Sequence, residues 1–150
     1  MPGINDHGRI RQNQEAAHRI ARVGKLTRVY VAGPYTNGDP KTNVNLAILQ
    51  ADILIEFGFN PFVPHLSHYQ HALYPRHYED WMRVDLDWVS VAEVVYRLPG
   101  ESSGADREVA LAHKLGIPVV YDIHELLKLR EVRDGVHYSR AWKQPTLPGM

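Results

Sequence analysis

Short apolar segments alternate with helix-like segments through the middle of the chain. The apolar segments are typical of buried strands and lie at Arg28–Ala32, Asn60–Pro64, Val91–Leu98 and Ile117–Tyr121. The segments between and after them have helical periodicity and lie at Asn43–Phe57, Tyr78–Val89, Gly104–Leu115 and Ile123–Val132. This alternation predicts an α/β fold, a doubly wound, flavodoxin- or Rossmann-like parallel sheet of four to five strands with flanking helices.

The chain has 150 residues, which is enough for one domain with a substantial core. We expect a helical N-terminal extension over residues 1–24, the α/β domain over 25–133 and a C-terminal tail over 134–150. Lys plus Arg equals Asp plus Glu at 17 each, so no global field attracts nucleic acid or anionic lipid. Cysteine is absent, which excludes disulfides and fits the cytoplasm, and no apolar run approaches the roughly 20 residues of a membrane span.

A histidine-rich connection follows the second expected strand. It contains His65, His68, His71 and His77, and the three-residue spacing raises the alternative of a zinc site. The segment lacks a clear helical pattern, however, and the chain has no cysteine and no H-E-x-x-H arrangement. We therefore expect no metal and no cofactor, and interpret the connection as a flexible lid that contacts a base or sugar and excludes water.

The expected topology brings two loops together. Right-handed crossovers place the first and third strands side by side, with the later strands diverging from them. The loops that leave these two strands, Gly33–Pro40 and Pro99–Ser103, should then flank the crevice where the strand order reverses. Ligands of open α/β sheets bind at such a crevice. There is no P-loop and no G-x-G-x-x-G motif after the first strand, which argues against NTPase chemistry and dinucleotide binding.

A carboxylate lies about one turn into the helix that follows the second of these loops. Ser102, Ser103 and Gly104 precede the helix, and N–H groups at a helix N-terminus bind anions. The alternative is a simple helix cap, because Ser103 with Asp106 resembles a capping box. Glu108 is surrounded in sequence by apolar residues, so its carboxylate must be paired or have a raised pKa. An anion site beside a buried carboxylate suggests chemistry on a nucleotide.

The preceding helix carries a second acidic candidate. Asp85 shares a helical face with Trp81 and Trp88, and a flat base would stack on such a wall. Core packing is the alternative for the tryptophans and is the one we expect for Trp88.

These residues resemble the nucleoside 2-deoxyribosyltransferase superfamily over about Arg28–Ile123. That family includes nucleoside deoxyribosyltransferases and 2′-deoxynucleoside 5′-phosphate N-hydrolases. The strings Pro64-His65-Leu66 and Leu98-Pro99-Gly100-Glu101-Ser102-Ser103-Gly104-Ala105 are similar to those of an uncharacterised bacterial and phage subgroup.

The resemblance implies a role for each candidate. Glu108 matches the glutamate nucleophile that attacks C1′ of the sugar, and Tyr30 matches the strand tyrosine that positions it. Asp85 matches the aspartate that handles the base or its leaving-group proton. Six residues before the nucleophile, transferases carry an aspartate that holds the 5′-hydroxyl, and the phosphate-accepting hydrolases carry a serine. Ser102 occupies this position, which favours a nucleoside 5′-monophosphate substrate.

The function expected from the resemblance is cleavage of the N-glycosidic bond of a (2′-deoxy)nucleoside 5′-monophosphate with release of the base. The alternatives are sugar transfer between bases, a phosphoribohydrolase acting on ribonucleotides, a non-catalytic nucleotide-sensing domain and a structural partner module. We expect a homodimer or higher homo-oligomer whose partner is a small nucleotide or nucleoside, with no nucleic acid and no membrane. The expected substrate-binding residues are Gly33, Pro34, Tyr35, Asn43, His65, Trp81, Ser102, Ser103 and Gly104.

Overall fold

The computed structural model describes residues 27–134. Within this range the chain forms a four-stranded sheet with flanking helices, which confirms the expected α/β class. The predicted N-terminal extension and nearly all of the predicted tail lie outside the described residues. No helix among the described residues is long and apolar enough to cross a membrane.

The sheet is parallel throughout and has the order β2-β1-β3-β4. Its strands are β1 (Arg28–Ala32), β2 (Asn60–Phe62), β3 (Val94–Arg97) and β4 (Val119–Val120). The first and third strands are neighbours, as predicted, with Tyr30 opposite Val95 in the register. The strand order therefore reverses between β1 and β3, and the loops that follow these two strands flank that point.

Three strands are shorter than the sequence predicts. The expected third strand began at Val91, but the N–H groups of Val91 and Ala92 bond back to Trp88 and Val89 and complete the end of the preceding helix. β2 ends at Phe62 and β4 spans only Val119–Val120. Apolar residues therefore extend beyond the hydrogen-bonded part of each strand, which apolar runs alone do not reveal.

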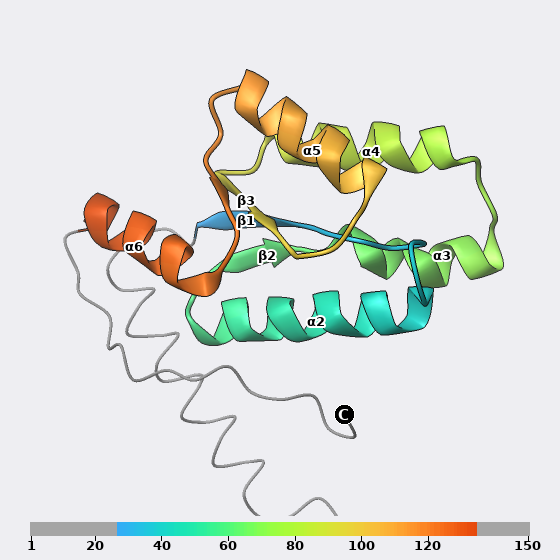
Figure 1. The fold of residues 1–150 in the computed structure, drawn as a ribbon, viewed down its shortest axis with the longest axis horizontal. Helices are drawn as coiled ribbons and strands as arrows, with labels where there is room; N and C mark the ends of the chain where they lie inside the picture. Colours follow the sequence, from blue (N-terminus) through green and yellow to red (C-terminus); the bar gives the residue numbers. More distant parts are fainter. Residues whose placement is uncertain (1–26, 135–150) are drawn as a thin grey trace, which may run out of the picture.

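Helices cover both faces of the sheet (Figure 1). The helices α2 (Pro40–Glu56) and α6 (Ile123–Asp134) pack on one face, and α4 (Tyr78–Ser90) and α5 (Ser103–Lys114) on the other. α2 begins three residues earlier than expected. The Oδ2 of Asp39 accepts a hydrogen bond from the Thr42 N–H at 3.1 Å, and Pro40 follows at the first helical position, where proline is tolerated.

The histidine-rich connection is more ordered than predicted. It contains a 3-10 turn, η1 (Pro64–Leu66), followed by the helix α3 (Ser67–Leu73). α3 has only seven residues and none of them is buried, so it is too short for a clear helical period, and its apolar residues Tyr69 and Leu73 are exposed. The expectation of an irregular connection was wrong for this part of the chain.

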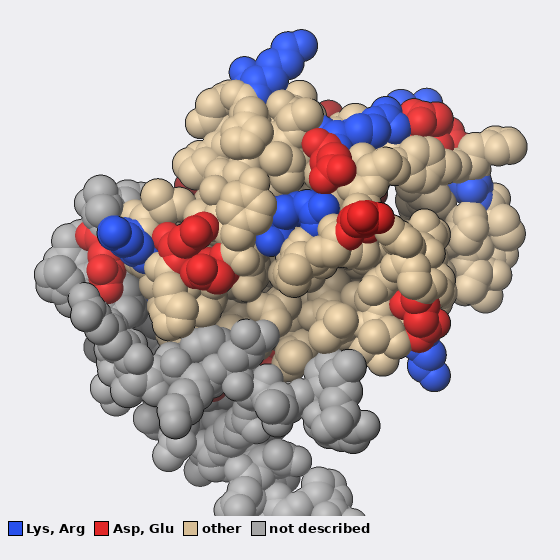
Figure 2. All heavy atoms as spheres, in the orientation of Figure 1, with Lys and Arg blue, Asp and Glu red and all other residues tan. Residues whose placement is uncertain are grey.

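Two apolar clusters hold the layers together. One lies between the sheet and α2 with α6, and includes Val31, Leu54 and Leu126. The other lies between the sheet and α4 with α5, and includes Tyr30, Val89 and Ala112. Acidic and basic side chains are interspersed on the face in Figure 2, in keeping with the balanced composition.

The loops that follow β1 and β3 are in contact, as the topology predicts. The Asn37 side chain donates a hydrogen bond to the carbonyl oxygen of Glu101 at 3.0 Å. Gly100 has a φ of +112°, and a Cβ atom there would lie 2.8 Å from Cγ of Pro34. Gly100 thus serves both an unusual backbone conformation and a close approach.

We predict that Gly100→Ala lowers the free energy of unfolding by about 2–3 kcal/mol, because it combines backbone strain with the clash against Pro34. Gly38→Ala is the matched control, since Gly38 has a φ of +90° but a Cβ there would meet nothing within 4 Å. The control should lose only about 1 kcal/mol. Urea denaturation of both variants measures the difference, and equal losses would mean that the two loops do not constrain each other.

Candidate active site

A pocket of about 1230 Å³ opens where the loops after β1 and β3 meet α4 and α5. Nine of the twelve residues expected from the sequence line it: Gly33, Tyr35, His65, Trp81, Asp85, Ser102, Ser103, Gly104 and Glu108. The other three, Tyr30, Pro34 and Asn43, contact residues of the pocket wall. The structure therefore brings candidates from five segments of the chain to one place.

Glu108 is the most deeply buried acidic residue of this pocket. Its side chain projects from the second turn of α5, and the residue is only 5% exposed. The hydroxyl group of Tyr30, in the middle of β1, donates a hydrogen bond to Oε1 of Glu108 at 2.7 Å. Tyr30 itself is completely buried and stacks on Phe62 of β2. A rigid strand side chain thus fixes the position of the carboxyl group.

The environment of Glu108 opposes its ionisation. Burial raises its pKa to about 8, and the nearby charge of Asp85 adds to this effect. The Tyr30 hydrogen bond and the positive charge of Arg97 act in the opposite direction. Desolvation therefore outweighs the two stabilising contacts, and the carboxyl group holds a proton near neutral pH.

Asp85 is the second carboxyl group of the pocket. It lies on α4, and partial burial raises its pKa to about 6. Because Asp85 also raises the pKa of Glu108, the two groups are electrostatically coupled and titrate as a pair. Between about pH 6 and pH 8 this pair carries a single proton. Pairs of carboxyl groups with different environments are suited to divided acid and nucleophile roles.

The two tryptophans of α4 lie in different environments. Trp81 lines the pocket, and its indole N–H donates a hydrogen bond to Nδ1 of His71 at 2.9 Å. Trp88 was expected in the core but is 49% exposed. It stacks on Phe62 at the edge of the sheet, with ring centroids 4.7 Å apart. The next residue, Val89, is buried in the core instead, so the core-facing side of α4 was predicted one residue too early.

The start of α5 faces the pocket with free backbone donors. Ser102 is the N-cap residue, and its Oγ accepts a hydrogen bond from the Ala105 N–H at 3.1 Å. The alternative of a capping box named Ser103 as the cap, whereas Ser102 caps the helix. Ser103 and Gly104 occupy the first two helical positions, where N–H groups have no acceptor within the helix. These two donors and the Ser102 hydroxyl proton are available to an anion.

The histidines hold the pocket wall together by separate contacts. Nε2 of His65 donates to the Pro34 carbonyl oxygen at 3.0 Å, and burial lowers the pKa of His65. His68 is hydrogen bonded to the Tyr35 hydroxyl group at 2.7 Å, and His71 accepts from Trp81. Within residues 27–134, no three His, Asp or Glu side chains come together in a group that could hold a metal ion.

Asn43 shapes the loop after β1. Its side-chain N–H groups donate to the carbonyl oxygens of Tyr35 and Asn37, both at 2.9 Å. Asn37 in turn holds the carbonyl oxygen of Glu101 on the other loop. The contacts of Asn43 are therefore with the protein, and it acts on the pocket through the loop.

The sequence interpretation missed several residues of the pocket, and Arg97 is the most consequential. The guanidinium group lies at the end of β3, with only a tenth of the side chain exposed. An arginine that ends an apolar strand just before a Pro-Gly turn is a usable signal, but it was not used. The other lining residues that were not named as candidates include Asn37, Arg76, Tyr78, Met82, Glu101 and Asp106, whereas His71 was expected in the lid.

Burial of Glu108 predicts an unusual dependence of stability on pH. Its folded-state pKa of about 8 lies above the ordinary glutamate value of about 4.5, so folding binds a proton between these pH values. The free energy of unfolding therefore falls as the pH rises from about 4.5 to about 8. The glutamine side chain of Glu108→Gln cannot ionise. At pH 8 this variant should therefore be more stable than the wild type by roughly 2–4 kcal/mol, and near pH 4 the two should be equally stable.

Urea denaturation at both pH values measures this difference. Glu79→Gln is the matched control, because Glu79 is exposed, is paired with Arg107 and has a lowered pKa. The free energy of unfolding of the control should not rise above that of the wild type at pH 8. A Glu108→Gln variant that is less stable than the wild type at pH 8 would contradict the assigned environment of Glu108.

Comparison with known proteins gives a family for this chain. No curated protein matches it. Among solved structures, it is similar to a 2-deoxyribosyltransferase from the psychrotolerant bacterium Bacillus psychrosaccharolyticus, with a TM-score of 0.47 and 16% sequence identity over 68% of this chain and 81% of the other. A family model described as "Domain of unknown function (DUF4406)" matches residues 27–121, which is well over half of the sequence. The chain therefore belongs to the DUF4406 family.

Proposed function

We propose that this protein is an enzyme that cleaves the N-glycosidic bond of a (2′-deoxy)nucleoside 5′-monophosphate, with Glu108 as the nucleophile. One observation carries the proposal: Glu108 is a buried carboxyl group on the wall of a large pocket, and it is held by Tyr30 and coupled to Asp85. A buried carboxyl group with a raised pKa destabilises the fold when it ionises, so a purely structural role does not explain it. The resemblance to nucleoside 2-deoxyribosyltransferases supplies the reaction that such a pair performs.

The proposed reaction has two steps. In the first, the single proton of the pair moves from Glu108 to Asp85, and the Glu108 carboxylate attacks C1′ as the bond from C1′ to the base nitrogen breaks. The base leaves with the bonding electrons and takes a proton from Asp85, and the sugar remains as an ester of Glu108. The transition state has oxocarbenium character, which a carboxylate beneath C1′ stabilises.

In the second step, Asp85, now ionised, removes a proton from a water molecule that attacks C1′. This releases the sugar 5′-phosphate and restores both carboxyl groups. A second base in place of water would give sugar transfer instead of hydrolysis. Trp81 lies on the same helix as Asp85 and lines the same pocket, which supports it as a wall for the base.

The phosphate group of the substrate is proposed to bind at the start of α5. Ser103 and Gly104 offer backbone N–H groups, and Ser102 offers its hydroxyl proton because its oxygen already accepts from Ala105. Glu108 follows one turn later on the same helix, so the phosphate group and C1′ of one nucleotide would bind to neighbouring turns. Gly104 also lies close to α4, since a Cβ there would be 3.2 Å from the Tyr78 hydroxyl oxygen.

The first test is a panel of nucleosides and nucleoside 5′-monophosphates, ribo and deoxy, assayed for free base by chromatography. We expect base release from a deoxynucleoside monophosphate. Glu108→Gln should lower kcat by at least about a hundredfold, because the nucleophile is lost. Mass spectrometry of rapidly quenched wild-type enzyme should detect a sugar phosphate attached to Glu108.

Each alternative gives a different result in this panel. A transferase releases base only when a second base is present, and a phosphoribohydrolase prefers ribonucleotides. A sensing domain raises its melting temperature with a ligand but releases no base over hours. Glu79→Gln serves as the control and should retain wild-type turnover. Full base release by Glu108→Gln on every active substrate would rule out Glu108 as the nucleophile.

The coupled carboxyl groups predict a bell-shaped pH dependence of kcat/KM. The reactive form holds one proton on the pair, so activity should be greatest between about pH 6 and pH 8. In Asp85→Asn the fall in kcat/KM at high pH, which reflects loss of the proton of the acid, should disappear. The remaining limb should report the ionisation of Glu108 alone, with a midpoint below about 8, because the charge of Asp85 that helps to raise the pKa of Glu108 is gone. An unchanged bell in Asp85→Asn would exclude Asp85 as a partner of Glu108.

A further inference from the structure

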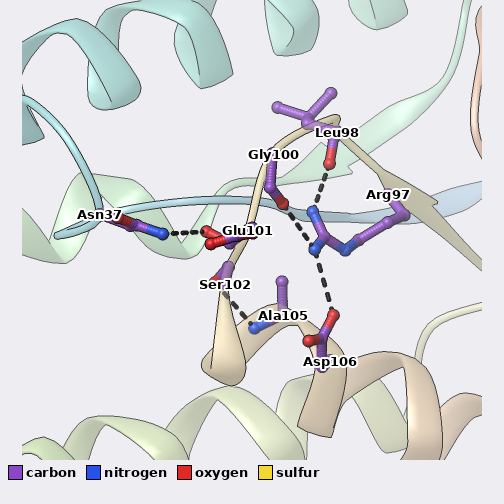
Figure 3. A network of polar contacts seen from close by, with 8 residues as sticks. All are labelled: Asn37, Arg97, Leu98, Gly100, Glu101, Ser102, Ala105 and Asp106. Atoms are coloured by element: carbon purple, nitrogen blue, oxygen red, sulfur yellow. Dashed lines mark hydrogen bonds and ion pairs between the residues drawn. The ribbon is translucent and has the colours of Figure 1, made fainter.

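The side chain of Arg97 is bound on three sides at the edge of the pocket (Figure 3). Its guanidinium group donates hydrogen bonds to the carbonyl oxygens of Leu98 and Gly100, the latter at 2.9 Å. It also forms an ion pair with the carboxylate of Asp106 at 3.2 Å, in the first turn of α5. One side chain therefore joins the end of β3, the following loop and the start of α5.

The 98–102 loop is held by further contacts at each end. The Leu98 N–H donates to the Ala32 carbonyl oxygen at 2.7 Å, which continues the pairing of β3 with β1. Asn37 reaches the Glu101 carbonyl oxygen from the opposite loop, and Ser102 caps α5. Arg97 binds the middle of the loop, where Gly100 adopts its unusual conformation. Without Arg97, two carbonyl oxygens of this turn would lose their only side-chain donor among the described contacts.

We propose that Arg97 is a positioning residue of this site: its guanidinium group fixes the 98–102 loop against the start of α5 and places a positive charge beside Glu108. The planar guanidinium group suits this role, because it presents several N–H donors in a fixed fork. Lysine has a single ammonium group and cannot hold two carbonyl oxygens and a carboxylate in the same geometry.

The groups that influence the ionisation of Glu108 come from four elements. Tyr30 on β1 donates a hydrogen bond, Asp85 on α4 adds negative charge, and Arg97 at the end of β3 adds positive charge. Arg97 is the cation that favours the ionised form of Glu108, and this effect lowers the pKa of Glu108. Asp106, on α5 itself, partly neutralises Arg97 through their ion pair. Removing Arg97 should therefore make Glu108 harder to ionise, and removing Asp106 should make it easier.

The test compares Arg97→Gln, Arg97→Lys and Asp106→Asn in the full-length chain. Ionisation of Glu108 is followed by NMR on protein with 13C-labelled glutamate carboxyl groups, and Glu108→Gln assigns the signal. Arg97→Gln should raise the titration midpoint of Glu108 by about one pH unit, and Asp106→Asn should lower it. Arg97→Lys should leave the midpoint near its wild-type value, because the charge remains.

Kinetics on the nucleotide panel separate the charge from the geometry. This arm rests on the proposed function, whereas the titration does not. In Arg97→Gln the pH optimum should move upward with the midpoint. In Arg97→Lys the pH optimum should stay in place while kcat falls, because the loop loses its hydrogen bonds to the guanidinium fork. Arg107→Gln is the matched control, since Arg107 is on α5 but pairs with the exposed Glu79, and it should leave the Glu108 midpoint unchanged.

Each result has a distinct meaning. An unchanged Glu108 midpoint in Arg97→Gln, or a shift in Arg107→Gln of the same size, overturns the inference. If the wild type releases no base from any substrate, the proposed function fails, and the titration still decides the role of Arg97. If Arg97→Gln does not fold, the opposite shift in Asp106→Asn decides, since it leaves the loop contacts of Arg97 in place.

Discussion

The hydrogen bond between Tyr30 and Glu108 is the contact on which the site depends. It joins the strand at the centre of the chain's topology to the helix that follows the neighbouring strand. Tyr30 has no freedom of its own, because the β1–β3 pairing and the cluster beneath α4 and α5 enclose it completely. The position of Glu108 is therefore set by the sheet and not by a loop, which suits a group that must meet a reacting atom within a fraction of an ångström.

Burial gives this contact its chemical character. In water a glutamate is ionised at neutral pH, and here desolvation holds the proton on the carboxyl group despite a hydrogen bond from Tyr30 and a positive charge from Arg97. Asp85 shares the pocket and raises the pKa further. The protein thus stores a single proton between two carboxyl groups, which is the state that acid and nucleophile chemistry at one bond requires.

The sequence predicted the fold class, the adjacency of β1 and β3 and the contact between the loops that follow them, since these depend on strand alternation and crossover rules. It did not predict α3, which has only seven residues, none of them buried, and is too short for a clear helical period. Nor did it predict the exposure of Trp88, because residues 84–90 of α4 have apolar side chains on more than one face. Arg97 was missed because its partners are backbone carbonyl oxygens and a carboxylate nine residues away, and spacing rules do not identify such contacts.

The two walls of the pocket are held by different kinds of contact. The wall formed by the loops after β1 and β3 is cross-linked by Asn37, Asn43 and Arg97, so a residue inserted into either loop would disturb both. The opposite wall, formed by α3 and the turn before α4, contributes His71 and Arg76 from a segment with no buried side chain in its helix. Diversity among relatives, and any redesign of ligand preference, should accordingly concentrate in residues 67–78, where sequence can change without disturbing the carboxyl groups.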